Sequence, residues 1–166
     1  DHVLLDQAFG CLLARDFLKN EEELFIGACD NGFEIKISDF NKLKINSDVI
    51  IFTHSNDLNI QHDPNAHSWL LLNKEKIFVK KVSLKRNIKG NFMKNHATTG
   101  MFWFKRSSDF LCNLEEMIFN NDRFNNKFYV DNMINYCIKN SLKVSYLDVK
   151  YVCWGTPYDY LVYEKS

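Results

Sequence analysis

The sequence predicts an α/β fold with a mixed, mostly parallel sheet that is flanked by helices and carries a hairpin-rich insertion. Strand-like segments alternate with amphipathic helical segments along the chain, which is typical of this class. Two strand-like segments between residues 68 and 86 are separated by a short polar stretch and predict the hairpin. The 166 residues are enough for one domain with its own core, so we expect residues 1–166 to form a single domain.

The first third of the chain is predicted as helix, strand, helix and strand. Apolar residues near helical spacing predict an amphipathic helix over residues 5–18, which leads into a strand at residues 24–29. Ser38 is the expected N-cap of the short helix "SDFNKLKI", and "DVIIFTH" follows as a strand. Residues 55–66 are rich in Asn, Asp and His and include Pro64, so they are expected to form a loop.

The rest of the chain continues the alternation. The segments "SWLLLN" and "KIFVKKVSLK" form the predicted hairpin, and "TGMFWFK" is an aromatic strand. Two amphipathic helices follow, the first capped by Ser107, Ser108 or Asp109. A strand, a turn and a last helix then complete the chain, with Thr156 as N-cap and Pro157 at the first helical position.

Composition and charge argue against several classes of protein. The chain has 21 basic and 21 acidic residues, so its net charge gives no general attraction to nucleic acid or to a membrane surface, and neither partner is expected. No apolar run has the length of a membrane span, and no signal peptide is recognisable. Five scattered cysteines without a CxxC pair indicate reduced thiols, and we expect a cytoplasmic protein.

The stretch "LFIGACDNGFEI" carries an apolar run directly onto Asp30 and Asn31. Ligands of α/β sheets bind outside the carboxyl ends of strands, so Asp30 is expected to face such a crevice. A carboxylate there suits a magnesium ion that carries nucleotide phosphates. Asp-Asn-Gly is also a strong turn signal, and on this stretch alone a turn is the more ordinary interpretation.

Several segments, taken in order, resemble the sugar-phosphate nucleotidyltransferases. They are "DQAFGCLLARDFL", "ELFIGACDNGF", "VKKVSLKRNIKGNFMKNHATTGMFWFKRSSDFL" and "NKFYVDNMINYCIKNSLKVSYLDV", followed by "WGTPYDYL", which is similar to the closing "GTPEDL" signature of the capsule and surface-polysaccharide branch. The resemblance covers nearly the whole chain. It implies a Rossmann-like nucleotide-diphospho-sugar transferase fold and a Mg²⁺-dependent enzyme. Such an enzyme moves a nucleotidyl group from a nucleoside triphosphate to a phosphorylated sugar or small phospho-alcohol and releases pyrophosphate.

The resemblance also assigns roles to residues. Asp30 matches the strand-end Asp that binds Mg²⁺, and Lys85 matches the hairpin lysine that reaches the phosphate of the second substrate. Gln7, Ala8 and Asn31 fall in the part that contacts the nucleotide. For Gln7 a solvent-facing place in the first turn of a helix remains equally open. Lys85 belongs to a basic run that is also typical of a solvated surface.

An acceptor site is expected near the hairpin and the strand that follows it. A Thr-Thr-Gly step matches the family's small-residue step, where a hydroxyl and a bare backbone approach the acceptor, although a bulge entering the strand explains it as well. Aromatic and polar groups at the hairpin entrance, together with a histidine just before the step, complete the set. The candidates are Thr98, Thr99, Gly100, His67, Trp69 and His96.

The chain departs from the family pattern at two points. The positions of a second metal-binding Asp hold Cys153 and Trp154, and the nearest acid is Asp148. The family's Gly-rich phosphate loop has no counterpart, so the chain looks like the central and C-terminal part of a larger nucleotidyltransferase domain and is expected to be inactive alone. A glycosyltransferase of the same fold and a non-catalytic remnant stay open as alternatives, although a glycosyltransferase is expected to carry a pair of acids where Asp30 is followed by Asn31.

Overall fold

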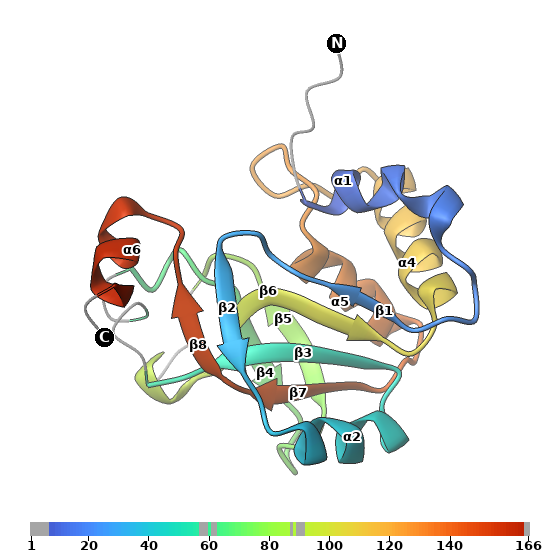
Figure 1. Ribbon diagram of the computed structural model, residues 1–166. Helices are drawn as coiled ribbons and strands as arrows, with labels where there is room; N and C mark the ends of the chain where they lie inside the picture. The colour runs from blue at the N-terminus through green and yellow to red at the C-terminus, as the bar shows by residue number, and fades with distance from the viewer. Residues whose placement is uncertain (1–6, 57–59, 61–62, 87, 89–91, 165–166) are drawn as a thin grey trace.

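The main sheet of the computed structural model has the strand order β5-β4-β6-β3-β7, and β1 also pairs with β6 (Figure 1). The structure describes residues 7–56, 60, 63–86, 88 and 92–164. The strands of this sheet are β1 Leu24–Ile26, β3 Val49–His54, β4 Trp69–Leu72, β5 Val79–Ser83, β6 Ala97–Phe104 and β7 Val144–Asp148. A separate two-stranded sheet pairs β2, Asn31–Glu34, with β8, Lys150–Cys153.

Different elements cover the two faces of the main sheet (Figure 1). The helices α1 Gln7–Leu13, α4 Ser107–Phe119 and α5 Val130–Lys139 share a core with one face. The small sheet and α2, Ile37–Asn46, pack on the other face, around Phe52 and Trp103. The last helix, α6 Pro157–Tyr163, follows β8, and short 3₁₀ turns span Arg15–Phe17 and Phe92–Lys94.

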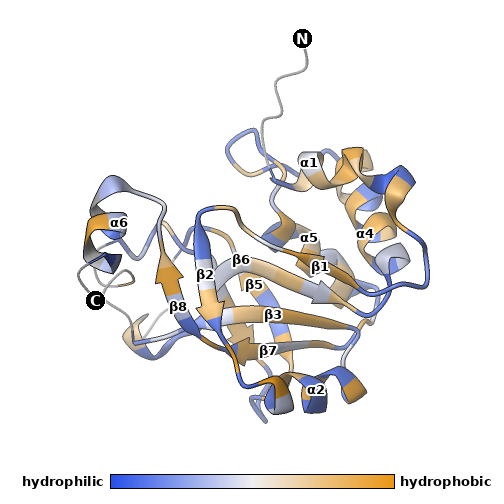
Figure 2. Cartoon of the chain, viewed as in Figure 1, coloured by the Kyte–Doolittle hydropathy of each residue, from blue (hydrophilic) through white to orange (hydrophobic). Residues whose placement is uncertain are grey.

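The sequence pattern accounts for these layers. All six residues of β3 are buried, as its nearly continuous apolar sequence predicts for a central strand covered on both faces. In Figure 2 β1 and β3 are hydrophobic along most of their length, whereas α2 carries many hydrophilic residues. In α5, Val130, Met133, Ile134 and Cys137 are buried at helical spacing, so this helix turns one apolar stripe to the sheet.

The predicted mixed α/β class is confirmed, but the expected majority of parallel strand pairs is not found. Among the described residues β3–β7 is the parallel pair, and the pairs β1–β6, β3–β6, β4–β5, β4–β6 and β2–β8 are antiparallel. The reason lies in the connections. The parallel strands β3 and β7 are separated along the chain by β4–β6, α4 and α5, whereas β4 and β5 form the predicted hairpin and β6 runs antiparallel to β1, β3 and β4.

Two element boundaries differ from the prediction. The helix expected over residues 5–18 runs from Gln7 to Leu13 and gives way to the 3₁₀ turn, while residues 5 and 6 lie outside the described part. The strand expected at residues 24–29 already ends at Ile26. Among the described helices, none is both long enough and apolar enough to cross a membrane.

The N-caps of α2 and α4 differ from the prediction as well. The N-cap of α2 is Lys36, and Ser38 lies inside the first turn. The N-cap of α4 is Arg106, while the Ser107 hydroxyl donates to the carbonyl of Lys19, 2.5 Å away. At α6 the prediction is confirmed: Thr156 Oγ1 accepts from the backbone N–H of Asp159, and the Asp159 carboxylate accepts from the backbone N–H of Thr156.

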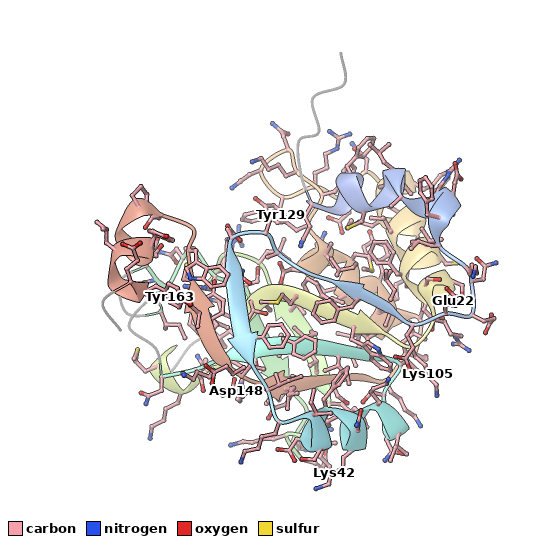
Figure 3. All side chains as sticks on the ribbon, viewed as in Figure 1. Glu22, Lys42, Lys105, Tyr129, Asp148 and Tyr163 are labelled. Atoms are coloured by element: carbon pink, nitrogen blue, oxygen red, sulfur yellow. The ribbon has the colours of Figure 1, made fainter. Side chains whose placement is uncertain are left out.

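Asp148 joins the carboxyl ends of the parallel strands β3 and β7 (Figure 3). Its carboxylate accepts hydrogen bonds from Thr53 Oγ1 at 2.8 Å and from Ser55 Oγ at 2.6 Å, and His96 Nδ1 lies 3.2 Å from Oδ1. Burial by itself raises the pKa of Asp148, but the hydrogen bonds from His96, Ser55 and Thr53 outweigh it and lower the pKa. The ionised carboxylate is therefore the form that the folded state stabilises.

The sign of this shift predicts the pH dependence of an Asp148→Asn variant. Because the folded-state pKa is lowered, the contribution of Asp148 to stability is present above the ordinary aspartate pKa and is lost as the pH falls through the folded value. The wild type should therefore exceed the variant in free energy of unfolding at pH 6, and the difference should shrink toward pH 3. Urea titrations across this range measure it. Asp16→Asn, at a highly exposed side chain, is the control, and a difference independent of pH would contradict the assignment.

Candidate functional site

A cleft of about 590 Å³ opens between the main sheet, the small sheet and the start of α5. Its lining comes from many segments: α1, the β1–β2 connection, the chain before β4, the turn after β5, β6, α5 and β8. Predicted site residues that line it are Gln7, Asp30, Asn31, His67, Lys85, Thr98, Thr99 and Gly100. Other lining residues are Gly27, Ala28, Cys29, Ala66, Ser68, Asp131 and Tyr151. Residues predicted for the nucleotide side and for the acceptor side therefore meet in one cleft.

The floor of the cleft is an interruption in the pairing of β6. Its residues 102–104 pair with β1 and β3, and Ala97 and Thr98 pair toward β3 and β4, but residues 99–101 have no strand partner among the described residues. At this point the register with β3 shifts, as at a β-bulge. The register shift agrees with the bulge that was one of two open interpretations of the Thr-Thr-Gly step, and the same step also lines the cleft.

Side chains satisfy the backbone groups that the interruption leaves without strand partners. Gln7 Nε2 donates to the carbonyl of Gly100 at 3.1 Å, and Asn31 Nδ2 donates to the carbonyl of Thr99 at 3.0 Å. The Thr99 hydroxyl donates to the carbonyl of Phe52 at 2.9 Å and accepts from the N–H of Met101 at 3.3 Å. Gly100 has φ +77°, in the left-handed region where a side chain is strained.

Asp30 lies in the connection between β1 and β2, at an exposed edge of the cleft. It does not directly end a buried strand, because β1 stops at Ile26 and β2 begins at Asn31. The backbone holds it in place, since the carbonyl of Asp30 accepts from the N–H of Trp154 at 2.8 Å. Trp154 also packs over Gly32, where a Cβ atom would meet the indole at 2.8 Å.

Lys85 reaches into the cleft from the turn after β5. Its backbone has φ +47°, and its ammonium group donates to the carbonyl of Ala66 and stands 6.0 Å from the ring centroid of Tyr129. The side chain is half-buried and lines the cleft, so the structure does not place it on an open basic surface. A fixed cation in a cleft is a group that attracts phosphate.

Asp131 and Tyr151 are among the lining residues that sequence reasoning missed. Asp131 is only 9% exposed, and burial raises its pKa, although a hydrogen bond from Thr98 and the charge of Lys85 oppose that rise. Burial likewise raises the pKa of Tyr151, whose ring stacks on that of His54 with centroids 4.2 Å apart. An acid in the first turn of a helix and a tyrosine in a short strand are ordinary features, so neither carries a distinctive sequence signal.

Three predicted residues do not line the cleft. Ala8 is fully buried in the core under α1. Trp69 is also fully buried, with its indole N–H donating to the carbonyl of Pro64 at 3.0 Å. His96 pairs with Asp148, and Figure 3 places Asp148 well apart from Tyr129, the neighbour of Lys85. Any role of Ala8 or Trp69 is thus to support lining residues, and His96 belongs to the junction of β3 and β7.

Within the described part of the chain, Asp30 does not belong to a cluster of side chains that is typical of a metal site. No group of three or more His, Cys, Asp or Glu side chains suited to a metal ion occurs among those residues. Asp159, the acid nearest in sequence to the closing glycine, accepts hydrogen bonds from Thr156 and Cys153. Cys153 and Trp154 occupy the positions of the family's second Asp, and Asp159 does not replace that acid because it is engaged by Thr156 and Cys153.

Comparison with known proteins identifies the fold and not the family. No family model and no curated protein matches the sequence. The structure is similar to the nucleoside-diphosphate-sugar pyrophosphorylase from Vibrio cholerae RC9, with a TM-score of 0.69 and 16% identity over 93% of this chain. It is similar to a putative glucose-1-phosphate thymidylyltransferase from Bacillus anthracis, with a TM-score of 0.67 and 17% identity over 93% of this chain. A third similar structure is the inositol-1-phosphate CTP transferase from T. maritima, with a TM-score of 0.62 and 17% identity over 96% of this chain.

The chain spans 60%, 58% and 60% of the lengths of these three chains, respectively. Nearly all of the present chain therefore corresponds to only part of each neighbour. At these identities the similarity establishes the architecture, in which a mixed sheet is flanked by helices. The chain has the fold of the sugar-phosphate nucleotidyltransferases.

Proposed function

We propose that the full protein containing this chain is a nucleotidyltransferase. It transfers a nucleotidyl group from a nucleoside triphosphate to a phosphorylated sugar or small phospho-alcohol and releases pyrophosphate. The cytoplasm is the proposed location. A role in surface-polysaccharide biosynthesis is proposed only from the likeness of "WGTPYDYL" to a closing signature of that branch.

The observation that carries this proposal is that Asp30 and Lys85 line one cleft, together with the interrupted edge of β6. Asp30 and Lys85 are 55 positions apart in the sequence, and separate motifs predicted them as site residues. A carboxylate and an ammonium group facing one cleft are the pair that a reaction between two phosphate-bearing substrates needs. The structural neighbours are named as a nucleoside-diphosphate-sugar pyrophosphorylase, a putative glucose-1-phosphate thymidylyltransferase and an inositol-1-phosphate CTP transferase. These names support the same reaction class.

The surroundings of Asp30 fit a magnesium ion bound together with nucleotide phosphates. The carboxylate is exposed at the cleft edge, and the chain passes it at Gly155, where a Cβ atom would lie 3.5 Å from Oδ2. Mg²⁺ commonly takes one or two protein carboxylates and fills its other positions with phosphate oxygens and water, so a single carboxylate is sufficient. When bound to Asp30, the ion supplies positive charge that offsets the charge developing on the leaving pyrophosphate.

The residues of the chain supply positioning and charge. Lys85 holds the phosphate of the acceptor, because its ammonium group is fixed inside the cleft and can form charge-assisted hydrogen bonds to phosphate oxygens. This cation reduces the repulsion between the acceptor phosphate and the anionic triphosphate. Gln7, Asn31 and Gly100 form the wall beside Asp30 and keep the nucleotide side of the cleft in a fixed shape.

The direct test is pyrophosphate release by the full-length protein. Each of the four nucleoside triphosphates is paired with a panel of sugar 1-phosphates and phospho-alcohols in the presence of Mg²⁺. Release that requires one triphosphate and one phosphomonoester is expected. Consumption of a finished sugar nucleotide would instead show a glycosyltransferase, and the absence of both reactions would show a non-catalytic protein.

Asp30→Asn should lower turnover by about 100-fold or more with little change in melting temperature, because it removes the proposed ligand of a catalytic ion without touching the core. Pyrophosphate release at several Mg²⁺ concentrations and thermal unfolding measure the two effects. Asp39→Asn, at an exposed acid in the first turn of α2, is the matched control and should retain wild-type activity. Near-normal turnover of the Asp30 variant would exclude Asp30 as a metal ligand.

Lys85→Met should raise KM for the phosphomonoester acceptor by about 10- to 100-fold and leave the affinity for the nucleoside triphosphate nearly unchanged. The lost interaction is a charge-assisted hydrogen bond to the acceptor phosphate. Lys80→Met removes an exposed lysine from β5 and is the control. If the Lys85 variant loses affinity for the triphosphate instead, Lys85 serves the nucleotide side of the cleft.

A further inference from the structure

Trp154 is an exposed tryptophan that packing in the hydrophobic core does not explain. It is 37% exposed, whereas Trp69 and Trp103 are 0% and 3% exposed. Among the described residues, the core beneath the small sheet includes Phe33 of β2 but not Trp154. Successive residues of a strand face opposite sides, so Gly32 faces away from this core, and the indole of Trp154 lies against it. A large aromatic ring on the outer face of the small sheet therefore needs another explanation.

Two consecutive residues, Trp154 and Gly155, contact the segment that carries Asp30. The backbone N–H of Trp154 donates to the carbonyl of Asp30 at 2.8 Å. The indole lies so close to Gly32 that a Cβ atom there would meet Cη2 at 2.8 Å, a distance at which one of the two groups must move. At Gly155 a Cβ atom would lie 3.5 Å from Oδ2 of Asp30, so the chain also passes beside the carboxylate. Asp30 is thus contacted at its backbone, beside its carboxylate and two residues further along.

The carboxylate of Asp30 depends on these contacts because its own hydrogen bonding is weak. Among the described residues it accepts from Nδ2 of Asn31 at 3.5 Å, which is longer than an ordinary hydrogen bond. A functional side chain has to be held within about 0.5 Å of its working position by the residues around it. For Asp30, the support comes from the backbone of its segment and therefore from the residues that pack on that backbone.

The indole of Trp154 is itself held by α6. The ring of Tyr163 meets it edge to face, with centroids 5.4 Å apart and planes at 76°. The start of α6 is fixed by the reciprocal hydrogen bonds between Thr156 and Asp159. The indole therefore has Gly32 on one side and a ring of α6 on another, and it connects this helix to the segment that carries Asp30.

We propose that Trp154 is a positioning residue whose indole, packed on Gly32, sets where the Asp30 carboxylate stands at the edge of the cleft. The proposal rests on the nucleotidyltransferase function, in which Asp30 binds the magnesium ion that accompanies the nucleoside triphosphate. Without the indole the segment can shift, and a misplacement of about 1 Å is enough to cost a site about 100-fold. Gly32 is needed for the same reason, because a residue without a Cβ atom leaves room for the ring. Lys85 lies on a different element, so the acceptor side should be unaffected.

The test is a double-mutant cycle on Gly32 and Trp154 in the full-length protein. Gly32→Ala displaces the indole and Trp154→Ala removes it, so each should weaken Mg²⁺-dependent binding of the nucleoside triphosphate about 10-fold. The two losses should not multiply in the double variant, because both break the same contact. Trp154→Phe keeps a ring over Gly32 and should restore most of the affinity. Calorimetric titration in Mg²⁺ and in EDTA measures these effects, and binding in EDTA and KM for the phosphomonoester should stay unchanged.

Gly10→Ala and Phe119→Ala are the matched controls for the two substitutions. Within the described part of the chain, a Cβ atom at Gly10 would meet nothing within 4 Å outside its own helix backbone, and Phe119 is 89% exposed. Neither control should change the affinity or KM. Losses that multiply in the double variant, equal weakening in Mg²⁺ and in EDTA, or a raised KM for the phosphomonoester would each overturn the proposal.

Hydrogen exchange keeps this inference distinct from the proposed function, because it needs neither catalysis nor a bound nucleotide. In the ligand-free protein the amide groups of residues 27–31 should exchange faster in Trp154→Ala than in the wild type or the Phe119→Ala control. Faster exchange in a protein that binds no triphosphate would support the role of Trp154 and contradict the nucleotidyltransferase. Triphosphate binding with exchange and affinity unchanged in Trp154→Ala would support the enzyme and overturn the role of Trp154.

Discussion

The interruption in the pairing of β6 is the constraint on which the cleft depends. A strand in the middle of a sheet cannot leave its backbone groups unsatisfied, because each unpaired buried group costs free energy comparable to a lost hydrogen bond. Here the side chains of Gln7 and Asn31 donate hydrogen bonds to the carbonyl groups of Gly100 and Thr99. The hydroxyl of Thr99 donates to the carbonyl of Phe52 and accepts from the N–H of Met101. These contacts tie α1 and the start of β2 to the sheet, and Asp30 is held beside them.

The cleft combines three ionisable side chains from three different packing environments. Asp30 stands at an exposed edge, Lys85 is half-buried on a turn, and Asp131 is almost completely covered. Water screens charges strongly at the edge and weakly inside, so the ammonium group of Lys85 acts on a charged ligand in the cleft more strongly than an equivalent surface lysine would. The arrangement favours a ligand that carries its own charge distribution into the cleft over one that binds by apolar contact.

The sequence allows the main strands and helices to be predicted because apolar spacing survives in them, as in β3 and α5. Ordered motifs also nominate most of the cleft, from Gln7 to Gly100. The sequence does not supply the direction of the strands, because alternating helices and strands are taken as evidence for parallel pairing. It also does not show which way a side chain faces: Ala8 and Trp69 are buried away from the cleft, and His96 pairs with Asp148. Asp131 is missed for the opposite reason, since a local role in its helix already accounts for its residue type.

The small sheet pairs a segment near the beginning of the chain with one near its end, from Asn31 opposite Cys153 to Glu34 opposite Lys150. Contacts between distant parts of a chain form slowly, because closing a long loop costs entropy before any contact compensates for it. During synthesis the small sheet beside Asp30 therefore cannot form until nearly all of these residues have left the ribosome. Until then the apolar face that β2 and β8 cover stays open to solvent, and transiently exposed apolar surface of this kind favours aggregation.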